Sequence, residues 1–463
     1  MRSIIGNKGK QMRKCFILTM IMAAAFFVPA FKALGDEEQI SEPPKNWTLE
    51  DCLRHGIATH PQIRIAASNV NAGKARLLQS QSGHDPQVSL RANWSHSKIE
   101  SSSRPILDST TDSTSESVAV AKTLYDSGQR QLSEKAARES LEAAHARYDS
   151  TLSEVAAAIK SAFFRAQQAQ ALLQVRLETL TGYERHLEKV QAFVEVGNRP
   201  PFDITRAQVD VANARVDLIS ARSQLKVALA NLARSIGLDT SVSITGFATL
   251  ELPSIAAINK EQLLKEALQR PEVKSADFQR RAAHYGVREA QKNLSPTLSA
   301  SADYRWSGTA TPLDRQWGAG VSMSWPVFDG SITRARIDSA KSQLDNAAAS
   351  LENLRISVIA ELENSITGVS DAIERYDATN YLVQQASESL YLAEARYDAG
   401  LSSPIEITDA RVEFARARGN QVVYYFDGLI AWAELDRVLG RMPAESRHTA
   451  IDEIKPGNGS SEK

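Results

Sequence analysis

Residues 297–329 read TLSASADYRWSGTATPLDRQWGAGVSMSWPVFD, and their side chains alternate between two kinds. From Leu298 to Trp306 every second residue is apolar or aromatic, while Ser, Asp and Arg occupy the positions between. From Trp317 to Val327 the alternation returns, with Gly or Ser at most intervening positions. A period of two is that of a β-strand whose two faces differ. The stretch therefore predicts a hairpin over residues 297–328, with a loop at residues 307–316.

An earlier stretch repeats this pattern. Apolar residues alternate with polar ones from Val88 to Trp94, and a weaker strand at residues 118–124 carries Lys122 on its apolar face. A Ser/Thr-rich segment, residues 97–115, lies between the two strands and is expected to be a loop. The sequence thus predicts a second hairpin at residues 86–125.

The two hairpins belong to a longer internal duplication. Four pairs of motifs recur in the same order, at an offset of 210 near the start of each copy and 203 later: Pro61 with Pro271, Pro86 with Pro296, Leu124–Gly128 with Val327–Gly330, and Gly197–Thr205 with Gly400–Thr408. Internal repeats of this kind indicate repeated structural units. We divide the chain into a first repeat at residues 36–256, a second at residues 257–441, and a tail at residues 442–463. Residues 239–259 and the tail are expected to form a small collar.

Helical periods occupy the rest of each repeat. A helix of about 35 residues is predicted at 48–83 and again at 260–293, before each hairpin. After each hairpin a helix of about 70 residues follows, at 126–196 and 329–399, and would be about 105 Å long. Returning helices are predicted at 203–236 and 406–439. The first long helix has a heptad seam typical of coiled coils: Leu152, Val155, Ile159, Ala162, Ala166, Ala169 and Leu173.

The N-terminus resembles an export signal. Residues 1–35 contain six basic residues and no acidic one, and Phe16–Val28 is a 13-residue apolar run. Ala33 and Gly35 offer small residues for cleavage before Asp36. We interpret residues 1–35 as a secretory signal peptide, the alternative being an uncleaved anchor. Without these residues the chain keeps 48 of its 54 Lys and Arg against 55 Asp and Glu, which argues against a nucleic-acid partner.

Four strands in an exported chain raise the question of what they pair with. A half-buried sheet of a water-soluble protein is one answer. The other is a membrane β-barrel wall, favoured by the regular alternation and the aromatic residues near strand ends. Four strands cannot close a barrel, since the smallest single-chain barrels have eight. A dimer would supply eight strands with a filled interior, and a trimer twelve with room for a lumen. We predict a mainly helical chain whose long coiled-coil helices form an α-barrel, and whose four strands complete a trimeric, 12-stranded outer-membrane β-barrel.

These features together resemble the TolC-like outer-membrane efflux family (outer membrane factors), from about Trp47 to Gly440. The resemblance rests on the duplication, on the aromatic-Asp steps Tyr125-Asp126 and Phe328-Asp329, and on the two turns after the long helices. It implies a homotrimer in the cell outer membrane of a Gram-negative cell, in contact with lipid and extending into the periplasm. It also implies a periplasmic adaptor (membrane fusion) protein and an inner-membrane transporter of the RND or ABC class as partners.

The resemblance also implies roles for particular residues. The turns would dock the adaptor through Gly197, Pro201, Gly400, Ser403 and Pro404. Glu406 and Asp409 match the acidic ring that constricts the periplasmic entrance, and Asp203 matches Glu406 in the first repeat. Tyr397 matches a tyrosine that holds the entrance shut in some members, whereas Ser402 stands where those members have an arginine. The plain alternative for the acidic residues is favourable charge at a helix N-terminus.

Catalysis finds no support in the sequence. The eight His are scattered without zinc-ligand spacing, and no phosphate-binding loop is present. We therefore predict a protein that is not an enzyme and has no metal site or cofactor. Its expected function is a passive exit duct for small molecules. The alternatives are the outer-membrane component of a type I protein-secretion system and a non-conducting structural protein of the envelope.

Overall fold

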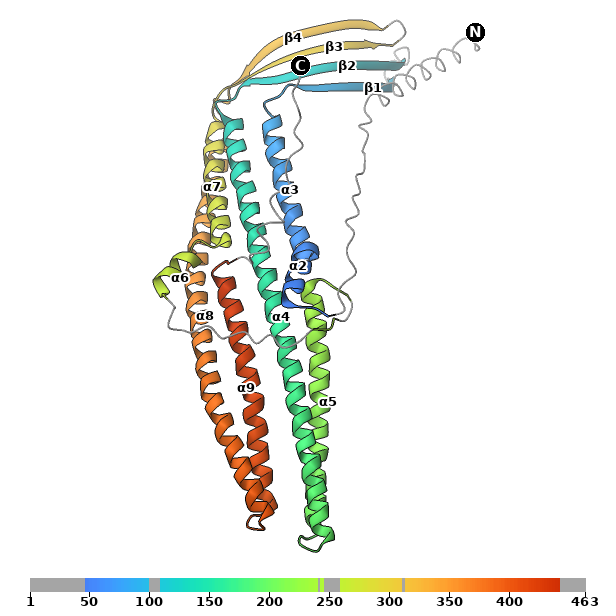
Figure 1. The fold of residues 1–463 in the computed structure, drawn as a ribbon. Helices are drawn as coiled ribbons and strands as arrows, with labels where there is room; N and C mark the ends of the chain where they lie inside the picture. Colours follow the sequence, from blue (N-terminus) through green and yellow to red (C-terminus); the bar gives the residue numbers. More distant parts are fainter. Residues whose placement is uncertain (1–45, 100–108, 240–241, 245–258, 310–312, 442–463) are drawn as a thin grey trace, which may run out of the picture. The chain divides into compact units, whose positions relative to one another are not determined.

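A computed structural model of the chain describes residues 46–99, 109–239, 242–244, 259–309 and 313–441 (Figure 1). One series of elements occurs twice. The first comprises α2 (Leu49–Thr59), α3 (Pro61–Ser82), β1 (Gln87–Ile99), β2 (Ser109–Tyr125), α4 (Gln129–Glu195) and α5 (Phe202–Ile236). The second comprises α6 (Lys260–Ala267), α7 (Pro271–Lys292), β3 (Thr297–Gly308), β4 (Asp314–Ser324), α8 (Ile332–Asp398) and α9 (Pro404–Val438). The predicted signal peptide, the tail and most of the predicted collar lie outside the described residues.

The helix predicted before each hairpin is wrong as a single element. Each is two helices that meet at a proline: α2 ends before His60 and α3 begins at Pro61, and α7 begins at Pro271 after the short α6. His60 and Arg270 have extended backbones, with ψ of 128° and 153°. The ring of a proline disfavours helical geometry in the residue before it, so the chain breaks there in both repeats.

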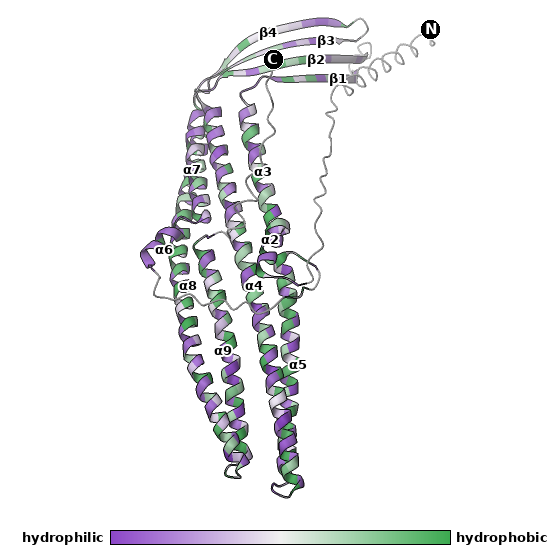
Figure 2. Ribbon diagram, in the orientation of Figure 1, coloured by the Kyte–Doolittle hydropathy of each residue, from purple (hydrophilic) through white to green (hydrophobic). Residues whose placement is uncertain are grey.

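The long helices and their returning partners match the prediction closely. α4 and α8 each have 67 residues, and α5 and α9 each have 35. α4 contacts α3 and α5 of its own repeat and α7 and α9 of the other. The two shorter helices of each repeat thus lie one after the other along α4 (Figure 1). Apolar and polar residues are interleaved along all four (Figure 2). Among the described residues, no helix is both long and apolar enough to cross a membrane.

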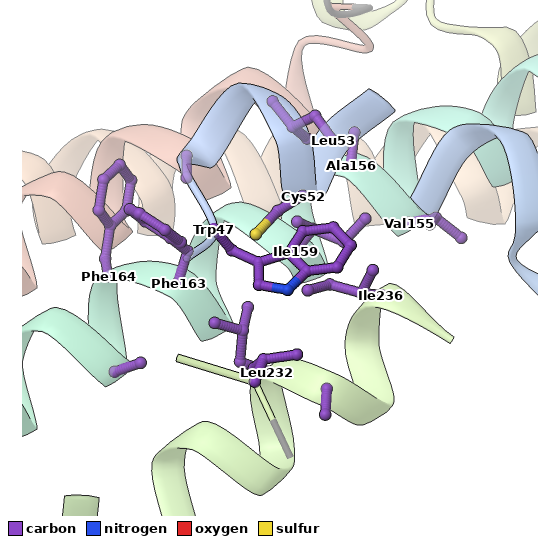
Figure 3. Close-up of a cluster of buried hydrophobic side chains, with 14 of the residues drawn as sticks. Trp47, Cys52, Leu53, Val155, Ala156, Ile159, Phe163, Phe164, Leu232 and Ile236 are labelled. Carbon is purple, nitrogen blue, oxygen red and sulfur yellow. The ribbon is translucent and has the colours of Figure 1, made fainter. Parts of the chain in front are cut away.

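The predicted heptad seam of α4 lies at these helix contacts. Five of its seven residues are buried, and the other two, Ala162 and Leu173, are half-buried. Around Ile159 and Phe163 the seam joins a cluster that also includes Trp47 and Cys52, beside Leu232 and Ile236 of α5 (Figure 3). The small and apolar residues that recur every three or four positions thus form a stripe along α4, which is buried against several neighbouring elements.

Each returning helix ends on a glycine that abuts the proline of the shorter helix. Gly237 and Gly440 have φ of +89° and +68°. A Cβ on Gly440 would lie 2.9 Å from both Arg270 Cβ and Pro271 Cδ. Only glycine adopts this conformation without strain and also leaves room for the neighbouring helix start.

Gly440→Ala is therefore expected to destabilise the protein by about 2–3 kcal/mol, as the left-handed backbone and the contact with Pro271 each add a cost. The measurement is the thermal melting temperature of the purified protein. Gly330→Ala is the matched control, because Gly330 also has a positive φ but has no atom within 4 Å of the added Cβ. Equal shifts in the two variants would show that the close packing at Gly440 adds nothing.

The four strands form one antiparallel sheet in the order β1-β2-β3-β4. Its register places most of the large apolar residues on one face, although Glu116, Lys122 and Arg315 lie there too. Tyr304 of β3, for example, lies opposite Val118 of β2 and Trp317 of β4. That face is exposed in the single chain, with Trp317 at 76% and Val321 at 65%. The opposite face carries mainly Ser, Gly, Gln, Asn and Arg. A sheet with one exposed apolar face and one polar face fits a barrel wall between lipid and water.

The strand limits differ from the prediction at two places. The expected loop at residues 97–115 is partly strand, because β1 continues to Ile99 and β2 begins at Ser109. The hydroxyls of Ser95 and Ser113 hydrogen-bond across this pair at 2.7 Å; Ser and Thr can thus pair across strands as well as form loops. At the other end β4 stops at Ser324 rather than continuing to Val327, since Pro326 has no N–H for the ladder.

The aromatic-Asp steps act as caps for the long helices. Asp126 accepts hydrogen bonds from the backbone N–H groups of Gly128 and Arg130, at 3.1 and 3.0 Å. Asp329 accepts one from Thr333 N–H at 2.8 Å. These carboxylates satisfy N–H groups that the first turn of a helix leaves free. The motif that marks the duplication in the sequence therefore fixes the point at which strand becomes helix.

Candidate functional site

The two turns after the long helices, residues 196–203 and 399–406, share one geometry and are called the tips below. Gly197 and Gly400 have φ of +77° and +72°. The residue after each glycine donates its N–H to a carbonyl five residues back, Asn198 to Phe193 and Leu401 to Arg396, both at 2.9 Å. This is the Schellman ending of a helix, which favours glycine at that position.

The helices leave the tips in two different ways. α9 begins with Pro404 in its first turn, and the Ser403 hydroxyl accepts a hydrogen bond from Ile405 N–H at 3.2 Å. α5 begins after Pro201 without a side-chain cap. All five residues predicted to dock a partner thus lie in the tips. Sequence reasoning missed three exposed apolar side chains beside them, namely Val196, Phe202 and Leu401, at 69%, 70% and 73% exposure.

Tyr397, at the end of α8 just before the second tip, is the residue at which the α4–α5 and α8–α9 helix pairs meet near the tips. It is 1% exposed and packs in a cluster with Val190 of α4, Ala207 of α5 and Ile407 of α9. The Arg199 guanidinium, from the other tip, lies 4.5 Å from the centre of the Tyr397 ring and donates to the Tyr397 carbonyl at 3.3 Å. Buried apolar area and a cation–π contact therefore hold the two tips together.

An arginine does contact Tyr397, but it comes from the first repeat rather than from position 402. The duplication offset of 203 aligns Arg199 with Ser402, so the arginine stands at the equivalent position of the first repeat. Ser402 itself is 9% exposed, and its hydroxyl has no hydrogen-bond partner among the described residues. The aligned repeats contained this signal, but sequence reasoning sought the arginine only in the second tip.

Asp203 lies with Tyr397 rather than with the other acidic residues. Its side chain is 7% exposed, and among the described residues neither Asp203 Oδ2 nor Tyr397 Oη has a hydrogen-bond partner. Burial raises the pKa of Tyr397; the charge of Arg199 opposes that rise and the charge of Asp203 adds to it. Unpaired buried polar groups are costly, so these two atoms oppose the apolar packing around Tyr397.

Glu406 and Asp409 lie on the first turns of α9, three residues apart and hence on one side of the helix. The Glu406 carboxylate pairs with Arg396 of α8 at 3.2 Å, and Asp409 is exposed. The predicted gate residues therefore differ in exposure: Asp203 and Tyr397 are buried, Glu406 is half-buried and Asp409 is exposed. The positions of Glu406 and Asp409 are equally those of acidic residues stabilising a helix N-terminus.

Further from the tips, His186 and Arg411 connect the two helix pairs, and sequence reasoning missed both. Arg411 of α9 donates to the Gly182 carbonyl of α4 and to Glu394 of α8, at 2.6 Å each. His186 of α4 is 4% exposed, and its ring centre lies 5.6 Å from that of Tyr397. Burial, aided by the charges of Arg411 and Lys189, lowers the pKa of His186 to about 4, so its ring is neutral at pH 7.

Acid is therefore expected to weaken this contact. The pKa of His186 is about 4 when folded and 6.5 when unfolded. Between these values the unfolded chain binds more protons, so stability is present above pH 6.5 and is lost as the pH falls to 4, by roughly 3 kcal/mol. The measurement is the melting temperature from pH 7 to pH 4. His186→Phe keeps an aromatic ring but binds no proton, so its melting temperature should fall less with acid; parallel curves would contradict this role.

Comparison with known proteins connects this geometry to a family. The sequence model of the family described as "Outer membrane efflux protein" matches residues 54–238 and 263–441, more than half of the chain. The solvent efflux pump outer membrane protein SrpC of Pseudomonas putida is 22% identical over 425 residues, which cover 89% of this chain and 90% of SrpC. Protein CyaE of Bordetella pertussis is 25% identical, with 81% of this chain and 80% of CyaE covered.

Among solved structures, the CmeC outer membrane channel of Campylobacter jejuni shares the fold, with a TM-score of 0.74 at 17% identity. The similarity covers 88% of this chain and 90% of CmeC. The matched ranges include both tips and all four strands. The resemblance seen in the sequence is thereby confirmed, and so is the location in the outer membrane. The chain belongs to the outer membrane efflux protein family, a family of ducts rather than of enzymes.

Proposed function

We propose that three copies of this chain form a passive duct through the outer membrane and the periplasm. In this proposal the duct exports small molecules together with an adaptor protein and an inner-membrane transporter. The observation that carries it is the sheet: four strands with one exposed, mainly apolar face and two edges, β1 and β4, that pair with no other strand of the described residues. In a bilayer, unpaired edge groups are too costly to persist, so β4 of one copy would pair with β1 of the next. Three copies then supply twelve strands, enough to enclose a lumen.

The helices support the same closure. α5 and α8 lie at opposite edges of the helix layer, because α5 contacts α4, α4 contacts α9, and α9 contacts α8. Both edges expose large apolar residues. They include Val216 and Ile219 on α5, at 65% and 64%, and Ile356 and Tyr391 on α8, at 61% and 71%. Packing α8 of one copy against α5 of the next would bury these side chains.

The tips offer a binding surface for a partner in the periplasm. Val196, Phe202 and Leu401 are exposed, belong to none of the hydrophobic clusters of the described residues, and flank the two Schellman turns. Such apolar side chains at a rigid turn suit a helical hairpin of an adaptor. The relative SrpC is a solvent efflux pump outer membrane protein, which favours small molecules as cargo. Energy would come from the inner-membrane transporter.

The test is the mass and conductance of the purified protein. We expect a trimer in detergent by native mass spectrometry, and discrete conductance steps after insertion into planar lipid bilayers. A stable monomer, or a trimer that inserts without conducting, would overturn the proposal.

In this duct Glu406 and Asp409 would ring the periplasmic entrance. The double variant Glu406→Ala/Asp409→Ala is expected to lower the cation-to-anion permeability ratio about threefold, because six carboxylates leave the mouth of the trimer. The reversal potential across a KCl gradient measures this ratio. Glu188→Ala removes an exposed carboxylate of α4 and serves as the control. An unchanged ratio in the double variant would leave these residues only the role of helix N-terminal charges.

A further inference from the structure

A cavity beside the tips lies between α4, α8 and α9. It has a volume of about 800 Å³ and is lined by residues from both repeats. This volume lies within the range of pockets that hold drug-sized molecules. The proposed function assigns no role to it.

The lining of the cavity combines an apolar wall with a few polar groups. Val175, Leu390 and Phe414 are among its apolar residues. Its charged residues are four basic ones and two acidic ones, namely Arg185, Lys189, Arg411, Arg418, Glu178 and Glu394. Glu394 is already paired with Arg411, and Lys189 with Asp398. Of the charged residues outside these two ion pairs, two are basic and one is acidic, so the net charge of the lining attracts anions.

Two buried nitrogen atoms in this lining lack partners. Among the described residues, neither Arg411 Nε nor His186 Nδ1 has a hydrogen-bond partner, and His186 is 4% exposed. The other guanidinium nitrogens of Arg411 bond to Gly182 and Glu394, which holds the guanidinium in place. A buried donor without an acceptor is costly, so a ligand that supplies the acceptor gains more than it would on the surface.

We propose that this cavity binds a small amphiphilic organic anion, whose acidic group accepts from Arg411 Nε and contacts the His186 ring while its apolar body lies along Leu390 and Phe414. The site needs both repeats, because His186 and Val175 belong to α4 and the other named residues to α8 and α9. Separating the tips would separate these walls. A bound anion therefore favours the closed contact, meaning the state in which Tyr397 joins the two tips. The reason is that a ligand shifts a protein toward the state that it binds better.

The probe is 2-naphthalenesulfonate, with the neutral 2-naphthalenesulfonamide as its matched analogue. Both are titrated calorimetrically into the full-length protein in detergent at pH 7. We expect the sulfonate to bind at least tenfold more tightly than the sulfonamide, which is the gain of one charge-assisted hydrogen bond in a buried site. Equal affinities would overturn the proposal, and so would the absence of sulfonate binding.

Two variants locate the binding. Arg411→Gln should reduce the preference for the sulfonate to less than threefold. Because Arg411 also connects helices, Ser387→Trp provides a second route: it fills the cavity from α8 and leaves the Arg411 bonds intact, and it should weaken both probes at least tenfold. Arg222→Gln removes the same charge from the exposed surface of α5 and should bind as wild type. Sulfonate binding that survives both Arg411→Gln and Ser387→Trp would place the ligand elsewhere and refute the site.

The binding measurement does not depend on conductance, so it separates this inference from the proposed duct. Where the protein conducts, saturating 2-naphthalenesulfonate should lower the open probability of wild-type channels severalfold and leave Ser387→Trp channels unchanged. A ligand that binds as expected but raises the open probability would refute the preference for the closed contact.

Discussion

Tyr397→Ala is expected to raise the open probability of the channel in planar bilayers at least tenfold. The Tyr397 ring joins the two tips through its contacts with Val190, Ala207 and Ile407, and it supports Arg199. Removing a buried aromatic side chain costs about 3–5 kcal/mol of stability. A loss of about 1.4 kcal/mol in the contact between the tips is enough to change the equilibrium between closed and open channels tenfold. Single-channel recordings at low voltage measure the fraction of time spent open.

Two controls bracket this prediction. Tyr397→Phe keeps the ring and removes the hydroxyl that lacks a partner, so its channels should stay as closed as wild type. Tyr381→Ala removes a tyrosine of the same helix that is 67% exposed, and it should not open the channel. Wild-type gating in Tyr397→Ala would mean that the tips are held together by other contacts, such as those of Arg411.

Gly400→Val is expected to abolish transport while trimers still form. At φ +72° a β-branched residue is severely strained, so the tip must adopt another backbone and displace Leu401 and Pro404. The sheet and the long helices do not depend on this turn, so assembly should persist. In a strain that lacks the chromosomal gene, the variant should confer at least tenfold less resistance than the wild type does to a toxic compound against which the wild-type protein protects. Native mass spectrometry checks the trimer.

The replacement chosen at this position separates two causes. Asn tolerates a positive φ better than other side chains do, so Gly400→Asn should retain most of the transport if the backbone is what matters. No atom lies within 4 Å of a Cβ placed on Gly400, so steric conflict inside the chain contributes nothing. Gly286→Val, in open space on α7 without a positive φ, controls for the substitution itself. Full transport by Gly400→Val would remove the docking role assigned to this tip.

The two tips contribute different residues to the contact between them. Their sequences align at an offset of 203, yet the first contributes Arg199 and Asp203, while the helices that flank the second contribute Tyr397, Glu406 and Asp409. A contact between unlike surfaces can pack a cation on a ring, which two identical copies of either tip would not do. The asymmetry explains why a search for the arginine within the second tip failed.

Local patterns in the sequence determined much of the architecture. The period of two predicted the hairpins, the period of 3.5 predicted the long helices, and the positions of Gly197 and Gly400 predicted the tips. These signals act over a few residues, through backbone geometry and the side chains of one turn or one strand. Where two local signals competed, the prediction was wrong: Pro61 broke a helix that the period continued, and Ser- and Thr-rich residues extended strands where a loop was expected.

Only the tertiary structure decided which residues form the site. Arg199 meets Tyr397, and Arg411 meets Gly182, across roughly 200 residues of chain. Asp203 and Glu406 occupy matching positions in the sequence, yet one is buried and the other pairs with Arg396 at the surface. Periodicity tells which side of a helix faces a neighbour but not which neighbour it is. The burial of these residues, their unpaired polar atoms and the cavity lined by His186 and Arg411 therefore arise only when the α4–α5 pair packs against the α8–α9 pair.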